Sequence, residues 1–233
     1  MVVADGLGGH LHGEIAAQIA VDHLGAEFLR EARPRLANPG AFLDRSVCDA
    51  HSAILREAYR LGLEEAPRTV IVACVVQEGH AHWTHVGDSR LYLVRQGRIL
   101  ARTRDHSFVQ SLVDAGRIRE EAIAVHPQRN LVTQCLGGEL APQPEPASSH
   151  RLAMHDVVLL CSDGFWGPLT QRQLLNALLG LALDKAIPEL MALAEARAGR
   201  ECDNVSVVAI RWGEDDKEIA EIKAELRDNA PRQ

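Results

Sequence analysis

The sequence predicts an α+β fold in which strands and helices pack on one another in layers. Strand-like and helix-like segments occur in blocks along the chain rather than in strict alternation, which disfavours a parallel α/β sheet. Short glycine-containing turns separate the middle strands, which is typical of antiparallel hairpins. The chain has 233 residues, 46% of them hydrophobic, so one domain can bury a large core.

The N-terminal part is predicted to contain one strand and two helices. Residues 2–4 are apolar and end at Asp5, so we expect a short buried strand there. Residues 13–30 carry apolar side chains on one face of a helix, and Pro, Asn and Gly residues end it. A second helix is predicted to follow these breaking residues and to run to about residue 60.

The middle of the chain changes from helical to strand periodicity. Residues 69–77 are almost continuously apolar or β-branched, and residues 81–86 follow after a Glu-Gly turn. Two further strands, at residues 91–94 and 99–101, follow after other glycine-containing turns. We predict that these four strands form an antiparallel meander.

The next region is predicted to be a helix, a loop and a strand. Residues 107–119 have a helical pattern, with Asp105 or Ser107 as the N-cap. Residues 137–149 are rich in Pro and Gly, so we predict a loop. The apolar strand that follows leads directly to Asp163.

The last part is predicted to contain two helices, a final strand and a tail. The helices cover about residues 170–181 and 185–198, and the strand follows them. The residues after Trp212 are highly charged, which is typical of a frayed helix or a disordered tail. No linker divides the chain, so we predict one domain over residues 1–212 and a charged tail over residues 213–233.

Composition and charge disfavour several classes of protein. The net charge of −7 is unlike the basic surface of a general nucleic-acid binder. Charges interrupt every apolar stretch before it reaches membrane-spanning length, and the N-terminus lacks the pattern of a signal peptide. The five cysteines include no CxxC pair. We therefore expect a cytoplasmic protein with buried free thiols, including those of Cys74, Cys161 and Cys202.

Three aspartates stand beside apolar strands and are the strongest functional signal in the chain. Asp5 and Asp163 follow their strands, whereas Asp203 precedes its strand. If the third strand runs opposite to the other two, all three carboxylates gather at one end of a sheet. Neighbouring carboxylates repel, and bound Mg²⁺ or Mn²⁺ relieves the repulsion. Each Asp alone is more often a simple turn residue, but the three together favour a metal site.

Five motifs occur in order along the chain: Asp5-Gly6-Leu7-Gly8-Gly9-His10, Gly87-Asp88-Ser89-Arg90, Asp105-His106-Ser107, Ser162-Asp163-Gly164 and Asp203-Asn204. In these motifs and their intervals, the chain resembles the metal-dependent PP2C-type (PPM) protein serine/threonine phosphatases of bacteria. The resemblance extends from Asp5 to Ile210. It implies a central antiparallel β-sandwich flanked by helix pairs, with a metal cluster in a channel at one end.

The resemblance also implies the metal ligands and the reaction. Asp5 would bridge two Mn²⁺ or Mg²⁺ ions, the Gly6 carbonyl would bind the second ion, and Asp163 and Asp203 would complete the first. Asp105, with Asp163, would hold a third and weaker ion, the alternative being that Asp105 caps a helix. A water activated by two metals would attack phosphoserine or phosphothreonine without a covalent enzyme intermediate. Such an enzyme would act in signalling, on phosphorylated proteins and against a Ser/Thr kinase of the same pathway.

For four further polar residues, the motifs give weaker evidence of a function. Asp88 and Arg90 are interpreted as parts of a hairpin turn, because Gly-Asp-Ser is ordinary turn chemistry. The resemblance also implies that residues 108–134 form a mobile flap over the site. His126 and Arg129 in this flap could meet substrate, but we favour a solvated loop, so the substrate-binding residues stay unknown.

The start of the chain departs from the family pattern. It begins four residues before Asp5, so the family's preceding strands, with an Arg that binds phosphate and an acidic pair, are expected to be missing from it. This departure motivates an alternative function, a weak or inactive phosphatase-like module that binds a phosphoprotein or a kinase.

Overall fold

The computed structural model describes residues 1–7, 12–199 and 203–213. Gly8, Gly9 and His10 of the first motif, together with Cys202 and residues 214–233, lie outside the described residues. The expectations for the Cys202 thiol and for the charged tail therefore stay predictions, as does the domain boundary after residue 212.

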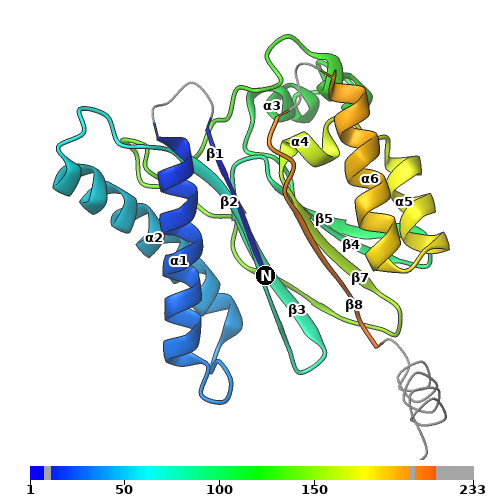
Figure 1. Cartoon of the computed structure of the whole chain (residues 1–233), viewed down its shortest axis with the longest axis horizontal. Helices are drawn as coiled ribbons and strands as arrows, with labels where there is room; N and C mark the ends of the chain where they lie inside the picture. The colour runs from blue at the N-terminus through cyan, green and yellow to red at the C-terminus, as the bar shows by residue number, and fades with distance from the viewer. Residues whose placement is uncertain (8–11, 200–202, 214–233) are drawn as a thin grey trace, which may run out of the picture.

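The molecule is built around two four-stranded antiparallel sheets (Figure 1). The first sheet has the strand order β1-β2-β3-β6 and the second the order β5-β4-β7-β8. The strands of the first sheet are β1 (Val2–Gly6), β2 (Thr69–Gln77), β3 (His80–Val86) and β6 (Ser148–Arg151). Those of the second are β4 (Arg90–Arg95), β5 (Arg98–Arg102), β7 (Val157–Cys161) and β8 (Val207–Arg211). The predicted α+β class is therefore confirmed.

A pair of long helices covers the outer face of each sheet (Figure 1). Helices α1 (Gly13–Glu31) and α2 (Pro39–Leu61) pack on the first sheet, and helices α5 (Gln171–Gly180) and α6 (Leu183–Ala198) pack on the second. Asn38 caps α2, accepting a 3.0 Å hydrogen bond from the backbone of Ala41, and Thr170 begins α5 with a capping box. The remaining helical segments are α3 (Phe108–Asp114), the 3-10 helix η1 (Glu120–Val125) and α4 (Asp163–Trp166).

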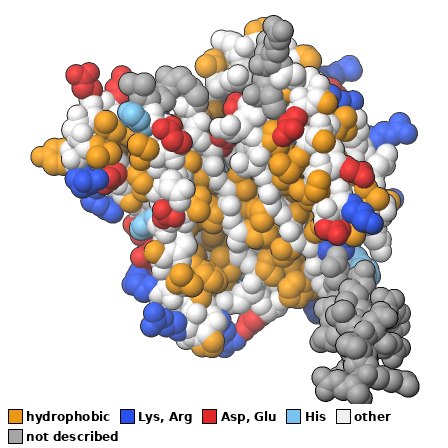
Figure 2. Space-filling model, viewed as in Figure 1, with side chains coloured by type: hydrophobic (Ala, Val, Ile, Leu, Met, Phe, Trp, Pro, Cys, Tyr) orange, Lys and Arg blue, Asp and Glu red, His pale blue; other side chains and the backbone are white. Residues whose placement is uncertain are grey.

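The core consists of three apolar layers. One lies between α1, α2 and the first sheet, one between the two sheets, and one between the second sheet, α5 and α6. The middle strands are buried on both faces, which explains why β2 and β7 are almost continuously apolar in sequence. Hydrophobic side chains also form a band across the middle of the surface seen in Figure 2, where the edge strands β1 and β8 lie (Figure 1).

The predicted four-stranded meander is wrong. Strand β3 pairs with β2 and β6, whereas β4 pairs with β5 and β7, so the chain crosses from one sheet to the other between β3 and β4. The crossing uses Gly87, which has a φ of 106°. A Cβ there would lie 2.1 Å from a side-chain carbon of Val70, so only glycine fits this turn.

Two smaller expectations also differ from the structure. The helix expected over residues 107–119 ends at Asp114, because Gly116 adopts a φ of 66° just after it. Ser107, not Asp105, caps this helix by accepting a hydrogen bond from the backbone of Gln110. The loop expected over residues 137–149 ends two residues early, at residue 147, because β6 begins to pair with β3 at Ser148. Among the described helices, none has both the length and the apolar character needed to cross a membrane.

Candidate metal centre

Asp5 and Gly6 are fixed at the end of β1 by their contacts with β2. Asp5 pairs with Val70 in the strand register, and its carbonyl accepts a 2.6 Å hydrogen bond from the hydroxyl of Thr69. A Cβ on Gly6 would lie 2.4 Å from the carbonyl carbon of Gly13, at the start of α1. Glycine is therefore required here for the strand end to approach the helix.

Asp163 and Asp203 are brought together by hydrogen bonds between the segments that carry them. Asp163 follows β7 and begins α4. The hydroxyl of Ser162 donates a 3.0 Å hydrogen bond to the carbonyl of Asn204 and accepts one of 3.0 Å from the backbone of Ser206. A Cβ on Gly164 would lie 2.5 Å from that same Asn204 carbonyl oxygen. Because β8 runs antiparallel to β7, Asp203 lies at the same end of the sheet as Asp163.

The structure thus brings Asp5, Asp163 and Asp203 together, and their charges interact. Burial raises the pKa of Asp5 to about 7, and the neighbouring charges of Asp163 and Asp203 add to this effect. The pKa of Asp163 is also raised, mainly by burial and secondly by the charge of Asp203. The close approach of the Asp163 side chain adds further to the rise in the pKa of Asp5.

Asp88 belongs to the same cluster, although the sequence interpretation treated it as a turn residue. It is 6% exposed, and burial raises its pKa to about 8, followed in effect by the charges of Asp163, Asp105 and Asp5. Its place in the sequence resembles that of Asp163, because it follows the end of a strand, β3, by two residues. The rule that selected the other aspartates, applied to β3 as well, would have selected Asp88.

Asp105 has a different environment. Its two carboxylate oxygens accept hydrogen bonds of 2.8 Å and 2.6 Å from the guanidinium of Arg90, and both side chains are buried. The guanidinium carbon also lies 3.3 Å from the ring centroid of Trp166. Asp105 is therefore charge-paired, and its expected role as a ligand of a third ion stays a prediction.

The carboxylate cluster fits a hard divalent cation. Among the residues that the structure describes, no Lys, Arg or His side chain forms an ion pair with Asp5, Asp88 or Asp163. The donors are oxygens with excess negative charge, the set that Mg²⁺ and Mn²⁺ prefer. In the described ranges, no three His, Cys, Asp or Glu side chains form a ready-made cage for one ion. Backbone oxygen and water would add to the ligands that the described carboxylates supply, as is common for Mg²⁺.

A cavity of about 510 Å³ opens over the cluster. Its lining includes Asp88, Asp163 and Asp203, together with Arg129 of the segment between η1 and β6 and Arg197 of α6. Arg197 is engaged by the carbonyl of Pro168 and the side chain of Gln173. The guanidinium of Arg129 has no hydrogen bond or ion pair with any described residue. Among the described residues that line the cavity, Arg129 is therefore the cation available to an anionic ligand.

The sequence matches one family over most of its length. The matching family model, protein phosphatase 2C, covers residues 1–197. The chain is 32% identical over 222 residues to a putative protein phosphatase 2C-type of Streptococcus pyogenes, spanning 94% of this chain and 87% of that protein. It is 36% identical over 209 residues to the serine/threonine protein phosphatase PstP of Mycobacterium tuberculosis, spanning 89% of this chain and 39% of that protein.

Solved structures show the same similarity in three dimensions. The crystal structure of the Mycobacterium tuberculosis phosphatase PstP superposes with a TM-score of 0.78 at 34% identity, covering 89% of this chain and 86% of that one. A structure of the PstP catalytic domain in complex with two manganese ions gives a TM-score of 0.75 at 32% identity, covering 90% and 86%. Sequence and fold agree, and the chain belongs to the protein phosphatase 2C family.

Proposed function

We propose that this chain is a Mn²⁺- or Mg²⁺-dependent phosphatase that hydrolyses phosphoserine and phosphothreonine in proteins. The observation that carries the proposal is the cluster of mutually repelling carboxylates of Asp5, Asp88 and Asp163, none of which forms an ion pair with a cationic side chain in the described part of the chain. The relatives named as serine/threonine protein phosphatases, and the PstP structure with two manganese ions, support the same function.

The residues would divide the work as follows. Asp5, the Gly6 carbonyl, Asp163 and Asp203 would hold two ions. When bound, such a pair supplies Lewis-acid activation of a water and neutralises charge on the phosphoryl oxygens. Hydrogen bonds between the strand ends keep these ligands in place, so little reorganisation is needed when the metal binds.

The ligand of a third ion, beside Asp163, has two candidates. Asp105 was expected from the resemblance, but both of its oxygens accept hydrogen bonds from Arg90. Asp88 lines the same cavity as Asp163 and has no cationic partner among the described residues. We propose Asp88 for this role, because a free carboxylate gains more from an ion than a paired one does.

Arg129 is proposed to bind the substrate. It lines the cavity that contains Asp88, Asp163 and Asp203, and its guanidinium is not engaged by a described residue. A guanidinium matches a phosphate group by charge-assisted hydrogen bonds, often two at once. Arg129 would therefore hold the phosphate ester, or an acidic side chain near it, over the metal centre.

The cellular setting is proposed on the same basis. A phosphatase of this class would oppose a Ser/Thr kinase that phosphorylates the same proteins. The described cysteines Cys48, Cys74, Cys135 and Cys161 are all free thiols, which suits the reducing cytoplasm.

The test is hydrolysis of a phosphothreonine peptide with added Mn²⁺, with and without EDTA. We expect metal-dependent phosphate release that Asp163→Asn loses and that Asp184→Asn, a matched change at an exposed position of α6, retains. Phosphate release that survives excess EDTA would contradict the proposal. A folded protein that binds Mn²⁺ without turnover would favour the alternative of a phosphatase-like binding module.

A further inference from the structure

Trp166 connects the segments that carry Asp88 and Asp163. It is the last residue of the one-turn helix α4, which begins with Asp163. Its indole Nε1 donates a 3.0 Å hydrogen bond to the backbone carbonyl of Asp88. The amide of Gly167, the next residue, donates a 2.7 Å hydrogen bond to the carbonyl of Asp163. The turn that carries one carboxylate is therefore bonded to the helix that carries the other.

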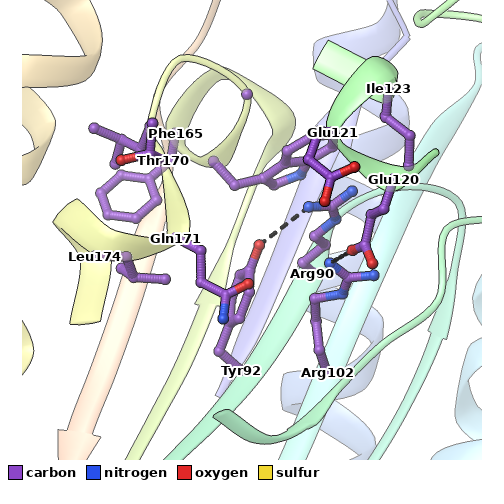
Figure 3. A pocket seen from close by; sticks show the side chains of 13 residues that line it. Arg90, Tyr92, Arg102, Glu120, Glu121, Ile123, Phe165, Thr170, Gln171 and Leu174 are labelled. Carbon is purple, nitrogen blue, oxygen red and sulfur yellow. Dashed lines mark hydrogen bonds and ion pairs between the residues drawn. The ribbon is translucent and has the colours of Figure 1, made fainter. Parts of the chain in front are cut away.

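The other side of the indole is held by a buried ionic unit. The guanidinium of Arg90 lies over the Trp166 ring, donates both hydrogen bonds to Asp105, and donates a 3.2 Å hydrogen bond to the hydroxyl of Tyr92. Figure 3 shows Arg90 and Tyr92 side by side in the wall of a neighbouring cavity of about 330 Å³. Because Arg90, Tyr92 and Asp105 are each at most 6% exposed, this unit gives the indole a rigid support.

The Asp88 segment needs such a support. Its carboxylate is buried beside Asp163, and like charges in a buried site repel strongly. The flanking Gly87 is tied to His106 through both its amide and its carbonyl. Among the described residues, the hydrogen-bond partner of the Asp88 carbonyl itself is Trp166.

We propose that Trp166 is a positioning residue that holds Asp88 against Asp163, so that the two carboxylates share an ion. This inference rests on the proposed metal centre. Helix α4 would then have two roles, because it carries Asp163 and, through Trp166, orients Asp88. Trp166 acts through Asp88 and does not itself bind metal.

The experiment measures Mn²⁺ binding to the metal-free protein, from the electron paramagnetic resonance signal of the free ion. The variants are Trp166→Phe, Asp88→Asn and the double variant. Phe keeps an aromatic ring at this position but removes the N–H donor together with the second ring of the indole. We expect Trp166→Phe to weaken the weakest Mn²⁺ site by about three- to tenfold, the scale of one net hydrogen bond. The double variant should bind Mn²⁺ no more weakly than Asp88→Asn alone, because both changes act on one contact.

Trp83→Phe is the matched control, since Trp83 is a buried tryptophan of the layer between the sheets. It should lower the melting temperature without changing Mn²⁺ affinity. Unchanged Mn²⁺ binding by Trp166→Phe, or a loss that adds fully to that of Asp88→Asn, would overturn the inference while leaving the metal centre intact. If the wild-type protein binds no Mn²⁺, the proposed metal centre fails, and the inference fails with it.

Discussion

The two ends of strand β7 carry aspartates in opposite electrostatic states, Asp156 at the start and Asp163 after the end. Asp156 precedes the strand, and its oxygens accept two 2.7 Å hydrogen bonds from Arg95 and one of 2.8 Å from the amide of Ala153. These donors outweigh its burial and lower its pKa. Asp163 follows the strand, faces other carboxylates instead, and its pKa is raised.

The difference separates a carboxylate that the protein neutralises by itself from one that we propose to bind metal. A buried charge that the protein neutralises by itself needs no ligand, and it contributes to the fold. A carboxylate cluster that the protein does not neutralise lowers the stability of the fold. Such a cluster is typical of a functional site, where a bound ligand relieves the repulsion. By this criterion Asp105 groups with Asp156, and Asp88 groups with Asp163.

The largest expected effect is the loss of turnover when Asp163, the aspartate that follows β7, is replaced. Asp163→Asn should lower kcat on a phosphothreonine peptide by at least about 1000-fold, since a charged group that stabilises the reaction is lost. Calorimetry of the metal-free variant should show no loss of stability, because one repelling charge is gone. A variant that is inactive because it is unfolded would contradict this assignment.

Asp105→Asn should remove the buried ion pair between Asp105 and Arg90. It leaves the buried Arg90 without its carboxylate partner, so the free energy of unfolding should fall by about 3 kcal/mol or more. Urea unfolding measures this loss, and Mn²⁺ affinity of the folded protein is the second readout. If the variant keeps wild-type stability but loses one Mn²⁺ ion, Asp105 is a metal ligand after all.

Asp156→Asn should have a similar but smaller effect at the opposite end of β7. Arg95 is 31% exposed and can regain water, so we expect a loss of about 1–3 kcal/mol in unfolding free energy. Metal-dependent turnover of the folded variant should match that of the wild type. Reduced Mn²⁺ affinity would show that the two ends of the strand are coupled.

Stability of the metal-free protein should fall as pH rises. The raised pKa values of Asp5, about 7, and Asp88, about 8, mean that the folded state binds more protons than the unfolded state above about pH 4. The contribution of these two groups to the free energy of unfolding is therefore largest at the acidic end of this window, and it decreases as pH rises toward 8. Melting temperatures at pH 5 and pH 8 test this, and saturating Mn²⁺ at pH 8 should restore the loss.

The smallest expected effect concerns Arg129. Arg129→Ala should raise KM for the phosphopeptide by about tenfold, with a smaller change in kcat, if its contact is a single charge-assisted hydrogen bond. Arg129→Lys should recover part of the loss, since the charge is kept. Steady-state kinetics with both variants measure it, and an unchanged KM would remove Arg129 from the substrate site.

Much of the fold follows from local patterns in the sequence. The apolar runs and turns placed β2, β7 and the long helices within a few residues, because continuous burial and helical periodicity are local signals. The meander failed because nothing local shows that the chain changes sheets at Gly87. Strand β6 was missed because its four residues are polar and mostly exposed, and pairing with β3 alone makes them a strand.

The candidate site shows the same division. The proximity of Asp5, Asp163 and Asp203 could be predicted because each stands next to an apolar strand. Asp88 was passed over because a Gly-Asp-Ser turn has an ordinary local explanation, and its proximity to Asp163 depends on the packing of two sheets. The pairing of Asp105 with Arg90 joins residues 15 positions apart, so no spacing rule in the sequence distinguishes it from a metal ligand.

The crossing of the chain between the sheets gives the metal centre a wider role. Asp5 belongs to the first sheet, Asp163 and Asp203 flank strands of the second, and Asp88 lies on the segment between them. Ions held by these residues would join the sheets at one end, as a rivet joins two plates. Substitutions in the layer between the sheets, far from any metal ligand, would then first change the metal concentration that the protein needs for folding and activity.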